Sequence, residues 1–133
     1  MRSALQKTLD LAAPLAKFGR DSVYLRIALD VAGTRVSEDT VFLTTPRFMD
    51  LPRPRTRVAV RMLSSRRARI VFTSPVFQHR FAFDIPGKAF TCSDNHFELY
   101  PGEPKAVEVE LAAPATAARL KGSVSHRSLA DTY

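Results

Sequence analysis

Four acidic residues between positions 84 and 103 are the first candidates for chemistry in this sequence: Asp84, Asp94, Glu98 and Glu103. Two carboxylates that approach one reacting group can serve as a general acid and a general base. A catalytic pair among these residues is therefore one interpretation. Roles in turns and on the surface are the other, because short acidic side chains also accept hydrogen bonds from the backbone.

The three histidines and the single cysteine form no recognisable metal or nucleophile motif. His79, His96 and His126 lie at none of the spacings typical of zinc sites, either with one another or with Cys92. The sequence contains no Gly-rich phosphate loop and no G-x-S-x-G motif. We expect satisfied or exposed histidines and a buried, apolar Cys92. No cofactor and no metal are predicted, and a lone cysteine allows no intrachain disulfide.

A dense group of arginines is the most distinctive charged feature of the chain. Its members are Arg53, Arg55, Arg57, Arg61, Arg67 and Arg69. The first four recur at even spacing, which places them on one face of an extended strand, opposite the apolar residues at 58, 60 and 62. No Asp or Glu falls between Leu51 and Phe83.

Three interpretations of these arginines remain open. The first is the solvated face of an edge hairpin, where charge discourages pairing with other strands. The second is a docking face for an acidic patch on a larger protein. The third is a basic stripe for nucleic acid, which the absence of interleaved aromatic residues disfavours.

Alternation of apolar and polar residues predicts short strands throughout the chain, separated by Pro and Gly. The expected strands are Val23–Val31, Val36–Thr44, Arg55–Met62, Arg69–Thr73, Phe77–Asp84, Phe90–Cys92, Phe97–Tyr100, Lys105–Leu111 and Arg119–Ser125. No long amphipathic helix is indicated. This pattern predicts an all-β fold, an immunoglobulin-like antiparallel sandwich of two sheets.

Length and composition agree with one soluble domain. The chain has 133 residues, and its 20 Lys and Arg against 13 Asp and Glu give a net charge of +7. No apolar run approaches the ~20 residues that cross a bilayer. We expect an N-terminal segment at 1–22, as an extended linker or a first strand because Pro14 limits a helix, followed by the sandwich at 23–133.

The stretch SDNHFELYPGE at residues 93–103 resembles a signature of the C-terminal immunoglobulin-like domain of β-mannosidase-type, family 2 glycoside hydrolases. Three further stretches agree with that family in order and spacing: SEDTVFLTTP at 37–46, DLPRP at 50–54 and SLADTY at 128–133. The resemblance covers residues 23–133. It implies that the catalytic carboxylates belong to a separate barrel, which is far too large for this chain, so the acidic residues here inherit no catalytic role.

The residues of the signature suit a structural turn. The group comprises Ser93, Asp94, Asn95, Phe97, Leu99, Pro101, Gly102 and Glu103. Asp94 and Asn95 can accept backbone hydrogen bonds, and Phe97 and Leu99 share one face of a strand. Pro101 followed by Gly102 favours a type II turn, and Glu103 can cap this turn or pair with an arginine.

The resemblance implies a non-catalytic accessory domain that packs against and stabilises the catalytic portion of a β-mannosidase or exo-β-glucosaminidase. Its partners would be the other domains of that glycosidase, in the cytoplasm, the periplasm or outside the cell. A carbohydrate-binding module is an alternative, although Trp is absent and the tyrosines offer no clear platform. A basic adaptor for polyanions is a further alternative.

Overall fold

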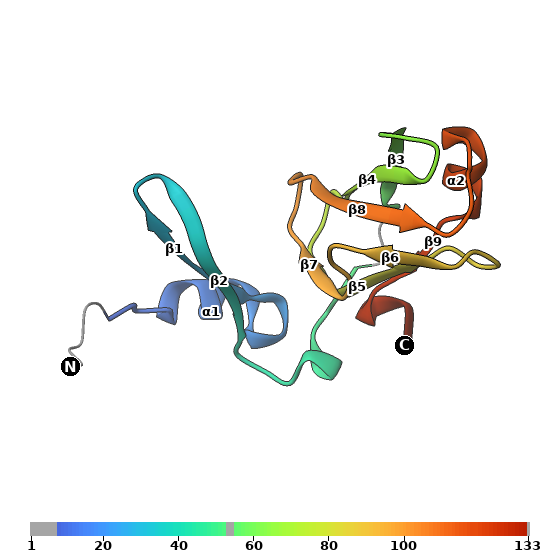
Figure 1. The fold of residues 1–133 in the computed structure, drawn as a ribbon. Helices are drawn as coiled ribbons and strands as arrows, with labels where there is room; N and C mark the ends of the chain where they lie inside the picture. The colour runs from blue at the N-terminus through green and yellow to red at the C-terminus, as the bar shows by residue number, and fades with distance from the viewer. Residues whose placement is uncertain (1–7, 53–54, 133) are drawn as a thin grey trace. The chain divides into compact units, whose positions relative to one another are not determined.

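The computed structural model describes residues 8–52 and 55–132, which divide into two compact units, Met1–Asp50 and Leu51–Tyr133. Figure 1 shows the elements of both units. The sequence-based boundary at residues 22 and 23 differs from this division. In the structure, the first two strands pair with each other inside the smaller unit. The assignment of residues 23–133 to one domain stays a prediction.

The smaller unit consists of two short helical segments, a hairpin and a helical turn. Its elements are α1 (Ala12–Phe18), a 3-10 helix (Arg20–Ser22), β1 (Tyr24–Val31), β2 (Thr34–Phe42) and a second 3-10 helix (Pro46–Phe48). The N-terminal segment is therefore partly helical rather than extended. Pro14 is tolerated because it lies in the first turn of α1, where its missing N–H has no intrahelical partner.

The hairpin of β1 and β2 turns through two residues with positive φ, Ala32 at 50° and Gly33 at 80°. This is the turn geometry that matches the twist of antiparallel strands. Apolar side chains along β1 are more than half exposed, namely Ile27, Leu29 and Val31. Within the described residues, the hairpin therefore carries an exposed apolar face.

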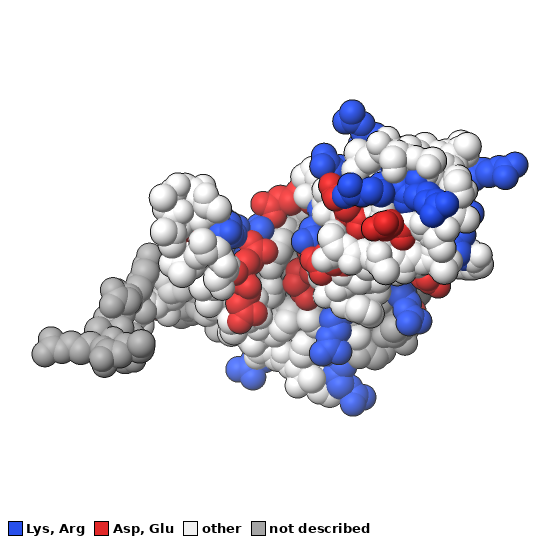
Figure 2. Space-filling model, in the orientation of Figure 1, with Lys and Arg blue, Asp and Glu red and all other residues white. Residues whose placement is uncertain are grey.

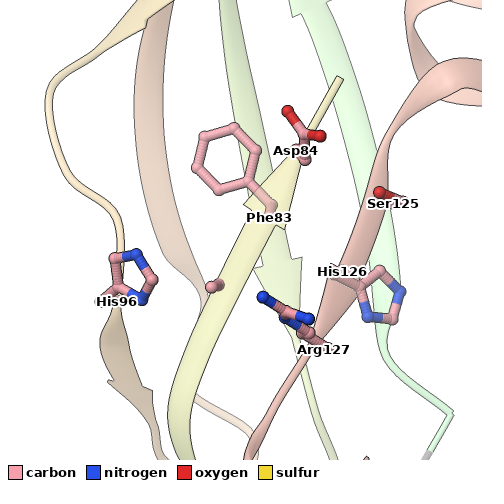
Figure 3. Close-up of a pocket in the computed structure, with 7 residues that line it drawn as sticks. Phe83, Asp84, His96, Ser125, His126 and Arg127 are labelled. Atoms are coloured by element: carbon pink, nitrogen blue, oxygen red, sulfur yellow. The ribbon is translucent and has the colours of Figure 1, made fainter. Parts of the chain in front are cut away.

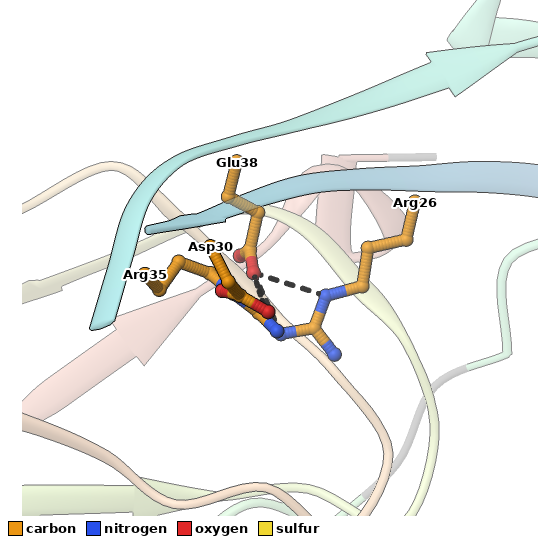
Figure 4. A network of polar contacts seen from close by, with 4 residues as sticks. All are labelled: Arg26, Asp30, Arg35 and Glu38. Atoms are coloured by element: carbon orange, nitrogen blue, oxygen red, sulfur yellow. Dashed lines mark hydrogen bonds and ion pairs between the residues drawn. The ribbon is translucent and has the colours of Figure 1, made fainter. Parts of the chain in front are cut away.

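Charged side chains join β1 to β2 (Figure 4). Glu38 accepts hydrogen bonds of 2.8 Å from Arg26 and from Arg35, and Arg35 also donates to Asp30 at 2.9 Å. The hydrogen bond from Arg35 lowers the pKa of Asp30. Partial burial of Glu38 opposes ionisation, but the bonds from Arg35 and Arg26 outweigh it and lower its pKa as well. The network therefore holds both carboxylates in their charged form.

The larger unit is a sandwich of two antiparallel sheets. One sheet has the order β3-β4-β8-β6 and the other the order β7-β5-β9. The strands are β3 (Arg57–Met62), β4 (Arg67–Thr73), β5 (Gln78–Asp84), β6 (Phe90–Cys92), β7 (Phe97–Leu99), β8 (Lys105–Leu111) and β9 (Ser125–Arg127). The helix α2 (Ala117–Ser123) and a 3-10 helix (Leu129–Thr132) complete the unit. The predicted all-β, immunoglobulin-like sandwich is confirmed.

Aromatic rings from the two sheets meet in the core. The ring of Phe72 on β4 lies 4.9 Å from that of Phe81 and 5.2 Å from that of Phe83, both on β5. Phe97 on β7 lies 6.2 Å from the same Phe72 ring. These side chains are buried, together with alternate residues of β4 and β8. The period-2 pattern of the sequence thus separates a core face from an outward face on each strand.

The strand predicted at Arg119–Ser125 is wrong, because residues 119–123 belong to the helix α2. Thr116 caps the helix, its hydroxyl accepting a hydrogen bond of 3.3 Å from the backbone N–H of Arg119. Leu120 is the only fully buried residue of α2. A helix that buries one residue in seven leaves no helical periodicity to read in the sequence.

None of the helices in the described parts of the chain is long and apolar enough to cross a membrane.

The core of the sandwich gives a first prediction. Phe97 is 8% exposed and its ring lies 5.5 Å from that of Phe81. Replacing Phe97 by Ala should lower the free energy of unfolding by about 3–5 kcal/mol, because the surrounding rings cannot close the cavity. Urea unfolding measures this loss. Leu63→Ala is the control, since Leu63 is 42% exposed and its truncation should cost less than ~0.5 kcal/mol. Equal effects of the two substitutions would contradict the prediction.

Candidate functional site

The 93–103 signature begins with three polar residues that fasten the β6–β7 connection to both sheets. The Ser93 hydroxyl accepts from the Glu108 backbone N–H at 3.0 Å, and the Ser93 N–H donates to the Glu108 carbonyl at 2.9 Å. Asp94 forms an ion pair with Lys105 at 2.9 Å. Asn95 accepts from the N–H of Phe83 at 3.1 Å and donates to its carbonyl at 3.0 Å. The Asn95 amide therefore takes the place of a paired strand residue beside β5.

The second half of the signature is a strand followed by a turn. Phe97 and Leu99 point into the core, and Tyr100 is buried with its ring 5.7 Å from that of Phe77. Glu103 donates its N–H to the Tyr100 carbonyl at 3.2 Å, and Gly102 has a φ of 71°. Pro followed by a residue with positive φ is a type II turn.

Glu98, between the two core residues of β7, stabilises a bulge in β5. The register of β5 and β7 shifts between Gln78 and Phe81, and Arg80 takes a positive φ of 51° there. The Glu98 carboxylate lies 2.7 Å from His79 Nδ1 and accepts from the Arg80 N–H at 3.4 Å. His79 itself is buried. This carboxylate and histidine are therefore engaged in a structural contact.

The arginine face is the second feature that the sequence singled out. We use this name for Arg55, Arg57, Arg61, Arg67 and Arg69, all of which are exposed; Arg53, also part of the prediction, lies outside the described residues. β3 is an edge strand of its sheet, and Arg61 lies directly opposite Arg69 on β4. The return strand thus lies beside the first, as expected.

One acidic residue of β8 partly neutralises this face. Glu108 accepts hydrogen bonds from Arg67 at 3.2 Å and from Arg69 at 3.3 Å. Figure 2 shows acidic side chains between basic ones on the visible side of the larger unit. In contrast, Arg55, Arg57 and Arg61 form no ion pair with any described residue. The arginine face therefore divides into a paired half on β4 and an unpaired half on and before β3.

Sequence reasoning missed Glu108 as the partner of these arginines. Glu108 is far from these arginines in the sequence, and it comes close to them only because β8 pairs with β4 in the folded sheet. The alternation in residues 105–111 held a usable signal, because Glu108 and Glu110 alternate with the buried residues Val107, Val109 and Leu111.

Of the remaining candidates, Asp84, His96 and His126 line one pocket, and Cys92 lies outside it. Asp84 accepts a hydrogen bond from the N–H of Ile85 at 2.8 Å, and Cys92 is half-buried against the core. A search of the described residues finds no group of three His, Cys, Asp or Glu side chains that could hold a metal ion. Of the weaker family stretches, 37–46 covers the second part of β2 and the residues that follow it. In the stretch 128–133, the Asp131 carboxylate accepts a hydrogen bond of 2.7 Å from the backbone N–H of Ser128, at the start of the last 3-10 helix.

Two antiparallel sheets packed over an aromatic core, with seven strands in the described part of the larger unit, define an immunoglobulin-like domain. A comparison with family models shows which family of immunoglobulin-like domains this is. The model Ig_mannosidase, an Ig-fold domain, matches residues 51–132, and the chain belongs to this family. The resemblance to the immunoglobulin-like domain of mannosidase-type glycoside hydrolases is thereby confirmed over residues 51–132, and the stretch at 37–46 lies outside the match. A search of curated proteins finds no match to the chain.

Asn95 provides a test of the signature. Its replacement by Ala removes both hydrogen bonds to the Phe83 backbone and should cost about 1–3 kcal/mol of stability. Asn95→Asp is a sharper variant, because a carboxylate can accept from the Phe83 N–H but cannot donate to the Phe83 carbonyl. Amide hydrogen exchange should show faster exchange at Phe83 in the Ala variant. If the stability of both variants stays within ~0.5 kcal/mol of that of the natural chain, the range of ordinary surface substitutions, the turn does not depend on Asn95.

His126 provides a pH test. Its ring stacks on Phe81 at a centroid distance of 5.3 Å and meets the edge of Phe72 at 6.4 Å. Desolvation lowers the pKa of His126 below its ordinary value of 6.5, although the Asp131 carboxylate acts in the opposite direction. The unfolded chain therefore binds a proton more readily than the folded one, so stability should fall as the pH drops through about 6.5.

His126→Phe keeps a ring at this position and removes the titrating group. The melting temperature of the natural chain should decrease more than that of the variant between pH 7.5 and pH 5.5, a range that spans the ordinary His value of about 6.5. Thermal melts at both pH values measure the difference. The same decrease in both proteins would mean that His126 does not carry this pH dependence.

Proposed function

We propose that residues 51–132 are a non-catalytic, C-terminal accessory domain of a β-mannosidase-like exo-glycosidase, which packs against the catalytic portion and stabilises it. The family match supports the kind of parent protein. The signature supports a structural role, because its polar side chains bind the backbone and side chains of neighbouring strands. The carboxylates Asp94 and Glu98 are occupied by Lys105 and His79, which leaves them poorly placed for acid–base catalysis.

The observation that carries the packing role is the unpaired half of the arginine face. Arg55, Arg57 and Arg61 are exposed and form no ion pair with the described residues, on an edge strand whose other face packs on the core. Arginine forms bidentate contacts with carboxylates, which suits it to interfaces with acidic patches. An acidic surface on the catalytic portion is therefore the partner that we propose for this face.

Reversing Arg55, Arg57 and Arg61 to Glu tests the proposal. The isolated chain should remain folded, because each exposed substitution changes stability by only about 0.5 kcal/mol. In the full-length parent enzyme, the same reversals should lower the melting temperature or release the domain to proteolysis. Differential scanning calorimetry of both proteins makes the comparison. The matched control reverses Lys88, Arg119 and Lys121, which are exposed, do not belong to the arginine face and give the same change in net charge.

Unchanged melting of the parent enzyme would reject docking through the arginine face and leave it as a solvated surface. Submicromolar DNA binding at physiological salt, lost in the triple reversal, would instead favour the polyanion adaptor. Nonspecific binding at that salt is ordinarily no tighter than about 10⁻⁶ M. The partial neutralisation by Glu108 argues against this outcome.

A further inference from the structure

A polar pocket of about 390 Å³ lies on the β7-β5-β9 sheet of the larger unit. Its polar lining comes from three places in the chain: Asp84 at the end of β5, Ser125, His126 and Arg127 on β9, and His96 just before β7. Figure 3 shows His96 on one side of β5 and Arg127 on the other. This volume is within the range of small-molecule sites, which begins near 300 Å³.

Strand register explains why the pocket forms. Ala82 lies opposite Arg127 and Asp84 lies opposite Ser125, so these four residues share the outward face of the strand pair. Phe81 and Phe83 occupy the core face. The small side chain of Ala82 leaves a hollow between larger neighbours. The opposite charges of Asp84 and Arg127 stand at diagonal positions across this hollow, and they form no ion pair.

His96 closes the third side in a backbone conformation that favours glycine. Its φ is 59°, which is uncommon for a residue with a side chain. The hydrogen bonds between Asn95 and the Phe83 backbone fix the chain before this position, and the pairing of Phe97 with Phe81 fixes it afterwards. The signature turn thus presents an imidazole to the pocket and holds it next to β5.

The polar groups around the pocket are available for a ligand. The side chains of His96, Ser125 and Arg127 form no hydrogen bond with any described residue. Asp84 uses one carboxylate oxygen to accept from the Ile85 N–H at 2.8 Å, and its other oxygen has no partner among these residues. The pocket therefore offers donors at His96 and Arg127, on opposite sides of β5, and an acceptor at Asp84.

This combination suits a ligand that both donates and accepts. An inorganic anion could use Arg127 and His96, but Asp84 would repel it. Neighbouring hydroxyl groups of a sugar can donate to Asp84 and accept from Arg127 at the same time. We propose that the pocket binds one sugar residue through two neighbouring hydroxyl groups, with Asp84 as acceptor and Arg127 as donor.

Binding through this pocket is expected to be weak. Every Phe and Tyr in the described part of residues 51–132 is buried or half-buried, so no ring offers a platform for the apolar face of a sugar. Without that contribution, we expect dissociation constants on the order of millimolar. The pocket could then hold a sugar that is already delivered by a parent enzyme, although the proposal does not depend on the docking role of the arginine face.

The test is a titration of the isotope-labelled 133-residue chain, followed by amide chemical shifts. Methyl β-mannoside and methyl β-N-acetylglucosaminide are the sugar probes, and inorganic phosphate is the anion probe. We expect saturable shifts at the amides of Ala82, Asp84, His96 and Arg127 with at least one sugar. Arg127→Gln and Asp84→Asn should each weaken binding at least tenfold. Arg119→Gln, at an exposed arginine outside both the pocket and the arginine face, should leave binding unchanged.

Several outcomes would overturn the proposal. The first is that neither sugar gives saturable shifts up to tens of millimolar, a concentration several times the expected dissociation constant. The second is that only phosphate saturates the pocket. The third is that a sugar binds both pocket variants as well as it binds the natural chain. The amide spectrum of each variant reports whether it is folded, and the two pocket substitutions are independent, so failure of one variant to fold leaves the other as the test. A negative result here does not touch the packing role, which the arginine reversals test separately.

Discussion

The ring of Phe72 at the centre of the sandwich is the constraint on which the larger unit depends. It contacts Phe81 and Phe83 on β5, Phe97 on β7 and His126 on β9, so every strand of the opposite sheet supplies a ring to it. Interiors are packed at the density of organic crystals, and such a contact tolerates little displacement. Each of these strands is therefore held with one face towards Phe72.

The positions of the polar side chains follow from this core, because successive side chains of a strand point to opposite faces of the sheet. Because Phe72, Ile70 and Ala68 point inward on β4, Arg67 and Arg69 must point outward. Because Phe81 and Phe83 point inward on β5, Ala82 and Asp84 must form the outward face. The arginine face and the polar pocket on the β7-β5-β9 sheet thus belong to opposite outer surfaces of the same two-sheet core.

Local alternation made much of this fold predictable from the sequence. The hairpin of β3 and β4 agrees with the strands expected at 55–62 and 69–73, and its register places Arg61 opposite Arg69. The helix α2 was not predictable in this way, because its stability rests on the Thr116 cap and on burial of Leu120 against the core. One buried residue gives no repeating hydrophobic pattern in the sequence, so the helix forms because of its tertiary packing.

The candidate sites were less predictable than the strands, because they depend on the order of strands within each sheet. Glu108 meets Arg69 only because β8 lies beside β4, and Arg127 meets Ala82 only because β9 lies beside β5. These pairs are separated by many residues in the chain. Alternation identifies which residues point outward, but it does not identify their neighbours. The turn chemistry of 93–103 is local, which is why that part of the site could be anticipated.

The same strand order determines where positive charge is concentrated. Arg61 and Arg69 are directly opposite, and like charges at that position disfavour pairing. Glu108 compensates for this on the β8 side by taking hydrogen bonds from both Arg67 and Arg69. No equivalent partner can exist beyond β3 within its sheet, because β3 is the edge strand. The unpaired charge therefore collects along this edge, where it hinders strand pairing with other chains and remains open to an acidic surface.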